Sequence, residues 1–285
     1  MKKKQTRKSG PCCEIQPHDP TSIGGQQNYR TIQTFFFHVS GVSNKLSLLS
    51  ININGKPSKL EADACRQLLT RHDIIMLSEI KTSHSFSIPG YKTIRSNIIQ
   101  GEEHRGGVAV LIKHKLWDSG VNAHYYKDQI WFSIGCVPQF YFGACYITPR
   151  DSPFFETHAF GIIQEECQQT NKSVIIMGDL NARIPDLNVL STTIKNIKYT
   201  ANPDHGSNTH GKEIISLCTS LNPCPINHLI YDNKTFDGGY TFRKKDKWIS
   251  QLDLALCSTA ALPNTIDLKI HNDIHFPSTH APISL

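Results

Sequence analysis

The sequence has 285 residues, of which 39% are hydrophobic and 19% charged, values typical of a globular protein rather than a disordered or fibrous one. The length is sufficient for a domain with a substantial core, and no apolar stretch approaches the roughly 20 residues that a transmembrane helix needs. The net charge of +6 is uneven, because residues 1–42 hold six Lys or Arg against two Asp or Glu.

The first 42 residues are rich in Lys, Gln, Pro, Ser and Gly, and we predict a basic, mostly disordered tail ahead of a folded domain at residues 43–285. Such a tail favours nuclear targeting or non-specific nucleic-acid contact, and a solvated tail without a role is an equally good interpretation. No apolar run follows the N-terminal lysines, so we predict no secretory signal. The nine cysteines include no Cys-x-x-Cys pair, which indicates a reducing compartment and no structural zinc. We therefore expect an intracellular, nuclear protein.

Hydrophobic periodicity predicts the following elements in chain order: strand 46–54, helix 59–71, strands 73–80, 91–96, 107–113, 129–135 and 141–148, helix 154–169, strand 174–177, helix 211–221, and strands 228–231, 240–243, 251–257, 268–270 and 281–285. Gly178 is expected to end the strand before it. The short connections between residues 91 and 148 favour hairpins, and residues 184–210 are expected to be a long polar loop. This mixture is typical of an α/β sandwich in which helices cover stacked sheets.

Polar side chains occupy the ends of several of these apolar strands. Asp179 and Asn181 follow one strand, and an extended backbone would point both side chains to the same side. A carboxylate and a carboxamide aimed at one point suit a hard cation or a phosphate oxygen, although a polar turn is the ordinary meaning of Gly-Asp-x-Asn. Further polar residues at strand ends are Asn52, Asn54, Glu79, Tyr146 and His280. Asp253 is embedded within the strand predicted at 251–257, where burial of a lone carboxylate is costly without a partner. Together they suit metal-assisted hydrolysis of a phosphoester, whereas each alone is explained as a surface acid, core aromatic or loop histidine.

Seven short motifs follow one another from about residue 46 to the C-terminus. They are Ser50–Gly55, Leu77–Lys81, Arg105–Val110, Tyr146–Pro149, Gly178–Arg183, Ser250–Asp253 and Ser278–Ile283. In this order they resemble the endonuclease/exonuclease/phosphatase superfamily, which includes apurinic/apyrimidinic endonucleases and pancreatic deoxyribonuclease. Tyr240–Arg243, ahead of Trp248, looks most like the apurinic/apyrimidinic-type, reverse transcriptase-associated endonuclease domains of non-LTR retrotransposons. The resemblance implies a four-layer α/β sandwich of two mostly antiparallel sheets flanked by helices, with the site at one end of the sheets.

The resemblance also implies a role for each matching residue. The metal site would comprise Glu79, Asn54, Asp179 and Asn181, and the catalytic residues would be Asp179, His280, Tyr146, Asn181, Asp253 and Asn52. Glu79 would be the main ligand of Mg²⁺, which Mn²⁺ could replace. Asp179 would activate the attacking water, and His280, oriented by Asp253, would bind the scissile phosphate. Asn52 and Asn181 would orient the phosphate, and Tyr146 would contact it or assist the leaving oxygen.

A cluster of basic residues precedes the Asp253 strand on an expected loop. It comprises Arg243, Lys244, Lys245 and Lys247. Beside an active site this loop would grip a phosphate backbone, and Phe242 or Trp248 could stack on bases, whereas a solvated hairpin tip is the ordinary meaning of a charge run. We therefore expect DNA as the partner, with RNA as the alternative. We expect no membrane partner, no small-molecule cofactor and a monomeric protein.

One motif departs from the family pattern at Thr279, where the family has Asp immediately before the histidine. Because a hydroxyl carries no charge to attract a cation, we predict an endonuclease that nicks DNA with weakened activity. The sequence ends at Leu285 with no reverse transcriptase region, so we expect a stand-alone, truncated or domesticated domain. The alternatives are a degenerate nucleic-acid-binding relic and a non-DNA phosphoesterase of the same superfamily, acting on RNA, inositol phosphates or sphingomyelin.

Overall fold

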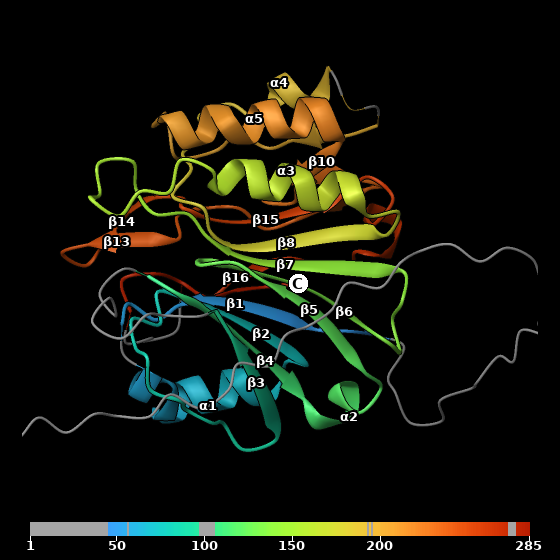
Figure 1. Ribbon diagram of the computed structural model, residues 1–285. Coiled ribbons are helices and arrows are strands. Elements are labelled where there is room, and N and C mark those ends of the chain that lie inside the picture. Colours follow the sequence, from blue (N-terminus) through green and yellow to red (C-terminus); the bar gives the residue numbers. More distant parts are fainter. Residues whose placement is uncertain (1–44, 56, 97–105, 193, 195, 273–277) are drawn as a thin grey trace, which may run out of the picture. The chain divides into compact units, whose positions relative to one another are not determined.

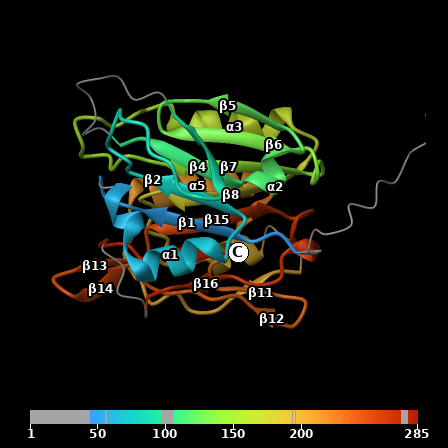
Figure 2. The same ribbon diagram turned by 90° about the horizontal axis from the view of Figure 1, so that it is seen from below.

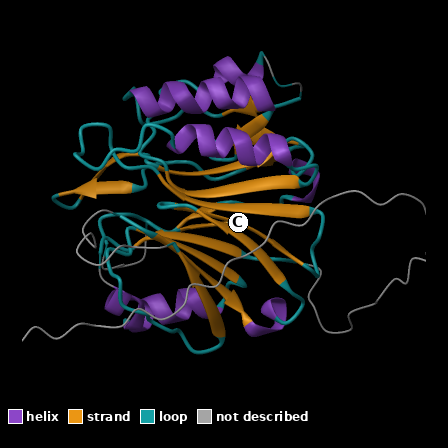
Figure 3. Cartoon of the chain, in the orientation of Figure 1, coloured by secondary structure: helices purple, strands orange, loops and turns teal. Residues whose placement is uncertain are grey.

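Two six-stranded sheets lie face to face, and helices cover their outer faces (Figure 1, Figure 3). The structure, a computed structural model, describes residues 45–55, 57–96, 106–192, 194, 196–272 and 278–285. The predicted tail at residues 1–42 and Arg105 of the third motif lie outside the described residues. No helix of the described part is long and apolar enough to cross a membrane.

The first sheet has the strand order β16-β17-β1-β2-β4-β3. Its strands are β1 (Leu48–Asn52), β2 (Ile74–Ser78), β3 (Tyr91–Arg95), β4 (Val108–Lys113), β16 (Lys269–Ile270) and β17 (Ile283–Ser284). A 3-10 helix η1 (Pro57–Glu61) and helix α1 (Asp63–Thr70) connect β1 to β2, which run parallel, and the other neighbouring strands are antiparallel. Leu49 and Ile51 of β1 pack with Leu68 of α1. Because side chains alternate along a strand, Leu48 and Asn52 face the second sheet instead.

The second sheet has the order β10-β15-β8-β7-β6-β5. Its strands are β5 (Val121–Tyr125), β6 (Gln129–Ile134), β7 (Phe140–Tyr146), β8 (Ser173–Asp179), β10 (Pro223–Pro225) and β15 (Asp253–Ser258). β7 and β8 are parallel and are connected through α3 (Ala159–Gln169), and the other neighbours are antiparallel. Helices α3 and α5 (Thr209–Leu221) cover the outer face of this sheet (Figure 1). The predicted sandwich of two mostly antiparallel sheets flanked by helices is therefore confirmed.

The remaining elements are short and lie outside the two large sheets. They are the helices α2 (His114–Trp117), α4 (Asn188–Ser191) and η3 (Leu262–Asn264), a small sheet of β9 (Lys198–Tyr199), β11 (Leu229–Tyr231) and β12 (Lys234–Thr235), and a hairpin of β13 (Phe242–Lys244) and β14 (Lys247–Ser250). The β13–β14 hairpin projects from one end of the sandwich, as Figures 1 and 2 both show.

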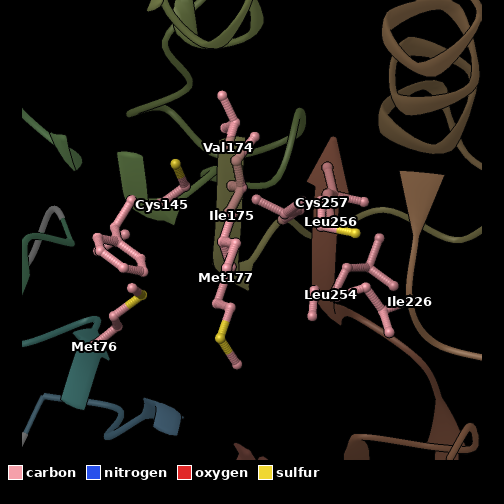
Figure 4. Packing of buried hydrophobic residues seen from close by; sticks show 14 of the residues in the cluster. Met76, Cys145, Val174, Ile175, Met177, Ile226, Leu254, Leu256 and Cys257 are labelled. Atoms are coloured by element: carbon pink, nitrogen blue, oxygen red, sulfur yellow. The ribbon is translucent and has the colours of Figure 1, made fainter. Parts of the chain in front are cut away.

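The main hydrophobic core lies between the two sheets. Met76 of β2 belongs to the same buried cluster as Met177 of β8 and Leu254 of β15, and Figure 4 shows these side chains near one another. Burial of each large apolar side chain contributes roughly 1.5–3 kcal/mol to stability. This packing fixes how the ends of β1 and β2 lie against the ends of β8 and β15.

Several sequence predictions need correction. Gly178 does not end its strand, because β8 continues through it to Asp179. A Cβ at Gly178 would lie 1.8 Å from the Cys145 carbonyl oxygen, so glycine here permits close pairing with β7. The expected loop at 184–210 contains α4 and β9. α2 and the strands β10, β12 and β14 were not predicted, because elements of two to four residues carry too little periodicity to recognise. The five-residue strand β5 was not predicted because all of its residues are exposed or only partly buried, so it lacks an apolar pattern.

Candidate active site

Three site residues meet because their strands are in register at one end of the second sheet. Tyr146 on β7 and Asp253 on β15 are the register partners of Asp179 on β8. β7 and β8 are parallel and both end here, whereas β15 is antiparallel and begins here with Asp253. The predicted grouping of these three residues is therefore a consequence of sheet topology.

Asn52 reaches this group from the other sheet. Its Nδ2 donates to Asp179 Oδ2 at 2.8 Å, and both residues are fully buried. The second oxygen of Asp179, Oδ1, accepts from the Asn181 backbone N–H at 3.0 Å. Burial raises the pKa of Asp179 above its usual range; the positive charge of His280 opposes this rise, and the charges of Asp253 and Glu79 add to it. The carboxylate is thus held at both oxygens and is more basic than an exposed aspartate.

His280 is the third member of a polar chain that runs from Asn52 through Asp179 and His280 to Asp253. Its Nδ1 lies 2.8 Å from Asp253 Oδ2 and 3.9 Å from Asp179 Oδ2. Burial alone would lower the pKa of His280, but the carboxylates of Asp253 and Asp179 outweigh it and raise the pKa to about 9. The ring is therefore an imidazolium at neutral pH, and Nε2 is not engaged by the Asp253 hydrogen bond.

Two residues that the sequence analysis did not assign to the site, Ser278 and Thr241, stabilise the positions of Asn52 and Asp253 in this polar chain. Ser278 Oγ donates to the Asn52 carbonyl oxygen at 2.7 Å, which ties the last motif to the end of β1. Thr241 Oγ1 accepts from the backbone N–H of Asp253 at 3.0 Å. Both lie within segments that carried the family resemblance, which was the available sequence signal.

Glu79 follows β2 and lies partly buried beside Asn52 and Tyr146. Its backbone is left-handed, with φ +51°. Burial opposes ionisation of the carboxyl group, but an ion pair with Lys81 and hydrogen bonds from Asn52 and Tyr146 outweigh it and lower the pKa of Glu79. Burial and the Glu79 charge raise the pKa of Tyr146, so its phenol stays protonated and acts as a donor. The structure therefore brings Glu79, Asn52 and Tyr146 together as predicted.

The predicted metal ligands are not all equivalent in the structure. Asn54 is exposed, and its Oδ1 lies 3.4 Å from the Lys81 ammonium nitrogen, which also pairs with Glu79. Two of the predicted ligands, Glu79 and Asn54, thus already bind the positively charged Lys81 ammonium group. Their carboxylate and amide oxygens are donors that also fit a divalent cation. Among the described residues, Asp179, Asp253 and His280 also place ligand atoms within 4.8 Å of one another.

Asn181 departs from the geometry expected of it. Its φ is +47°, so the chain has already turned and the prediction of an extended backbone with both side chains on one side is wrong. The side chain donates through Nδ2 to the Ile147 carbonyl oxygen at 2.9 Å, while the backbone N–H bonds to Asp179. Asn181 therefore belongs to a compact turn at the site.

The basic hairpin of β13 and β14 starts next to His280. Phe242 forms a backbone bridge to His280, and the two rings lie 5.0 Å apart. The Arg243 N–H donates to the Thr279 carbonyl oxygen at 2.9 Å, and its guanidinium lies 5.7 Å from the centre of the Trp248 ring. Lys244, Lys245 and Lys247 are exposed on the hairpin, with a turn of two left-handed residues between the strands. The structure thus places Phe242 and Arg243, at the start of the hairpin, beside the predicted catalytic histidine and its neighbour Thr279, and the three lysines follow along the same hairpin.

Comparison with known proteins identifies relatives of this fold. The family model described as the Endonuclease/Exonuclease/phosphatase family matches residues 49–280. Among solved structures, the chain is similar to the AP endonuclease LMAP from Leishmania major, with 13% identity, a TM-score of 0.63, and 84% of this chain and 86% of that one covered. It is also similar to the 3′ phosphatase NExo from Neisseria bound to a product DNA hairpin, with 17% identity, a TM-score of 0.59, and 84% of this chain and 98% of that one covered. A third similar structure is the endonuclease domain of TRAS1, a telomere-specific non-LTR retrotransposon, with 16% identity, a TM-score of 0.58, and 84% of this chain and 97% of that one covered. No match is found among curated protein sequences. At these identities the structural similarities establish the fold.

Proposed function

The chain belongs to the endonuclease/exonuclease/phosphatase family, and we propose that it is a Mg²⁺-dependent phosphodiesterase that nicks DNA. The observation that carries this proposal is the polar chain from Asn52 through Asp179 and His280 to Asp253. It places the Asp179 carboxylate, which is basic and held at both oxygens, next to the buried His280 imidazolium at the end of the two sheets. A phosphodiester is anionic, so hydrolysis requires both a base for water and positive charge for the phosphate.

In the proposed reaction, Asp179 accepts a proton from water as the water oxygen forms a bond to phosphorus. Its raised pKa makes it a stronger base than an exposed aspartate, and the contacts from Asn52 and Asn181 hold both of its oxygens. His280 donates a hydrogen bond from Nε2 to a phosphate oxygen, and its positive charge opposes the charge that develops there. As the bond to the leaving oxygen breaks, the protonated Tyr146 phenol is available as a hydrogen-bond donor.

Glu79 and Asn54 would hold the metal, with Asp179 and Asn181 as further oxygen-bearing neighbours. When bound, Mg²⁺ would supply a positive charge that polarises the phosphate oxygens. The Lys81 ammonium now contacts both Glu79 and Asn54, so we expect it to be displaced from Glu79 when a divalent cation binds.

We propose a nucleic-acid polymer as the substrate because of the β13–β14 hairpin. Its lysines are exposed, and its first residue, Phe242, contacts His280. A nucleic-acid backbone bound by the hairpin would therefore approach the catalytic residues. Lysine contacts to phosphates give affinity without sequence preference, and Trp248 offers a ring for stacking. DNA is the polymer bound in the related NExo structure, and a nuclear location of this chain is part of the proposal.

The test is incubation of the purified protein with supercoiled plasmid and Mg²⁺. We expect nicked circles, and we expect EDTA or Asp179→Ala to abolish them. Asp186→Ala is the matched control, because it removes an exposed carboxylate that accepts from the Asn188 N–H at the start of α4 and touches none of the catalytic residues. Absence of nicking by a folded protein, or equal nicking by Asp179→Ala, would contradict the proposal.

Thr279 favours a second candidate, a non-catalytic nucleic-acid-binding protein. Its backbone oxygen accepts from Arg243, and its side chain offers no charge where the family pattern has Asp. A relic of this kind would still bind DNA through the hairpin, with a steep salt dependence, but would cleave nothing. The plasmid assay combined with a binding measurement separates the two candidates.

A further inference from the structure

Asn208, which precedes α5, joins that helix to the turn after Asp179. Its Oδ1 accepts from the Gly211 N–H at 2.8 Å and from the Arg183 N–H at 3.0 Å. Its Nδ2 donates to the Asn181 carbonyl oxygen at 2.7 Å. Two donors face one side of the amide and a carbonyl faces the other, so all three bonds fix a single orientation of this side chain.

The backbone of α5 approaches the same turn closely. A Cβ added to Gly211 would lie 2.1 Å from the Arg183 carbonyl oxygen, so only glycine permits this approach. The Arg183 guanidinium is in turn held by the buried Asp204, with Nη2 and Oδ1 2.5 Å apart. Asp204 Oδ2 also accepts from the Gln251 N–H at 2.9 Å, two residues before Asp253. The start of α5 and the loop before it therefore support both carboxylates of the site.

We propose that Asn208 is a positioning residue that holds the Asp179–Asn181 turn in its catalytic geometry, in addition to capping α5. This inference rests on the proposed function. Asn181 has a left-handed backbone, which Asn adopts more readily than most residues with a Cβ but which is still helped by contacts that hold it. The Asn208 side chain donates a hydrogen bond to the Asn181 carbonyl oxygen, and the backbone N–H of Asn181 donates to Asp179 Oδ1. Loss of the Asn208 donor would therefore free the turn and the carboxylate together.

A helix cap alone does not need this donor. Capping requires only an acceptor for backbone N–H groups, and Asp supplies that as well as Asn does. Asn208→Asp therefore keeps the acceptor but replaces the donor with an oxygen that repels the Asn181 carbonyl group. Asn208→Ala removes both. Comparison of the two variants separates positioning from capping.

The experiment measures kcat, KM and Tm for plasmid nicking by the wild type and both variants. We expect Asn208→Asp to lower kcat by about tenfold to a hundredfold with little change in KM and with Tm close to that of the wild type. Asn208→Ala should lose a similar factor in kcat and also show a lower Tm. Asp186→Ala, which removes a side-chain acceptor at the start of α4, should leave kcat unchanged. A wild-type kcat in Asn208→Asp would overturn the proposal.

A second measurement keeps this inference separate from the proposed function. Amide hydrogen exchange by NMR follows the Asn181 N–H, which bonds to Asp179, and the Gly211 N–H, which bonds to the cap. In Asn208→Asp we expect about tenfold faster exchange at Asn181 and unchanged protection at Gly211. Unchanged exchange at both positions would overturn the positioning role even if the wild type cleaves no DNA. Absence of wild-type cleavage with faster exchange at Asn181 would instead contradict only the proposed function.

Discussion

Replacement of Asp253 by Asn should shift the pH at which His280 loses its proton. The His280 Nδ1–H can still donate to the amide oxygen of the introduced side chain, so the ring orientation should be kept while the negative charge is removed. Because the charge favours the imidazolium, its loss must lower the pKa of His280. Asp179 remains at 3.9 Å and retains part of the stabilisation.

The magnitude follows from the raised pKa. A rise from about 6.5 to about 9 corresponds to roughly 3 kcal/mol in favour of the imidazolium. Asp253 is the nearer of the two carboxylates and the first among the charges that raise the pKa of His280, so its removal should lower that pKa more than the loss of any other single charge. Above the pKa the protonated fraction falls about tenfold for each further pH unit. Activity that needs the imidazolium should therefore decrease in Asp253→Asn at alkaline pH and much less at pH 6.

The assay is the pH profile of kcat/KM for plasmid nicking, together with an NMR titration of the His280 ring. In the wild type the alkaline limb should lie near pH 9, and in Asp253→Asn it should lie at a lower pH. Asp128→Asn, a change at a buried carboxylate that is not among the main charges acting on His280, should leave the limb in place. An unchanged His280 titration in Asp253→Asn would refute the reasoning about charge, whether or not the enzyme is active.

Three further outcomes are expected. Thr279→Asp should raise Mg²⁺-dependent nicking by about tenfold, because an added carboxylate attracts the cation, and an unchanged rate would show that Thr279 does not limit the site. Replacement of Lys244, Lys245 and Lys247 by Ala should reduce the slope of log K against log salt by up to about 2.7 in a DNA-binding titration, and an unchanged slope would exclude these lysines from phosphate contact. Glu79→Gln should raise the Mg²⁺ concentration for half-maximal nicking by about tenfold or more, and an unchanged metal titration would exclude Glu79 as the main ligand.

Much of the fold was accessible from the sequence because its signals are local. Apolar runs such as the one before Asp179 mark buried strands, and the order of short motifs indicated the family. The predicted strand ends were less accurate, because glycine at 178 is a usual sign of a break. Only the close approach of the Cys145 carbonyl group shows why glycine lies within the strand there.

The sequence indicated which residues form the candidate site, but it did not indicate which of them contact one another. Residue types at strand ends indicated which side chains belong to it, since an apolar strand has no packing reason to end in Asn52 or Asp179. No sequence pattern indicated that Lys81 pairs with the predicted metal ligand Glu79. Nor did any pattern indicate that Asn208 holds the turn at Asn181, because residues 184–210 have the composition of a polar loop.

The sequence by itself determined the fold class, the family and the set of polar residues at the strand ends. The tertiary structure alone decided which of them touch. Asn52 meets Asp179 because the core between the sheets fixes their separation, and Asp253 meets Asp179 because β15 and β8 pair in one register. The physical reason is that local patterns report burial and backbone preference, whereas contacts between distant segments depend on sheet register and packing, which no local pattern specifies.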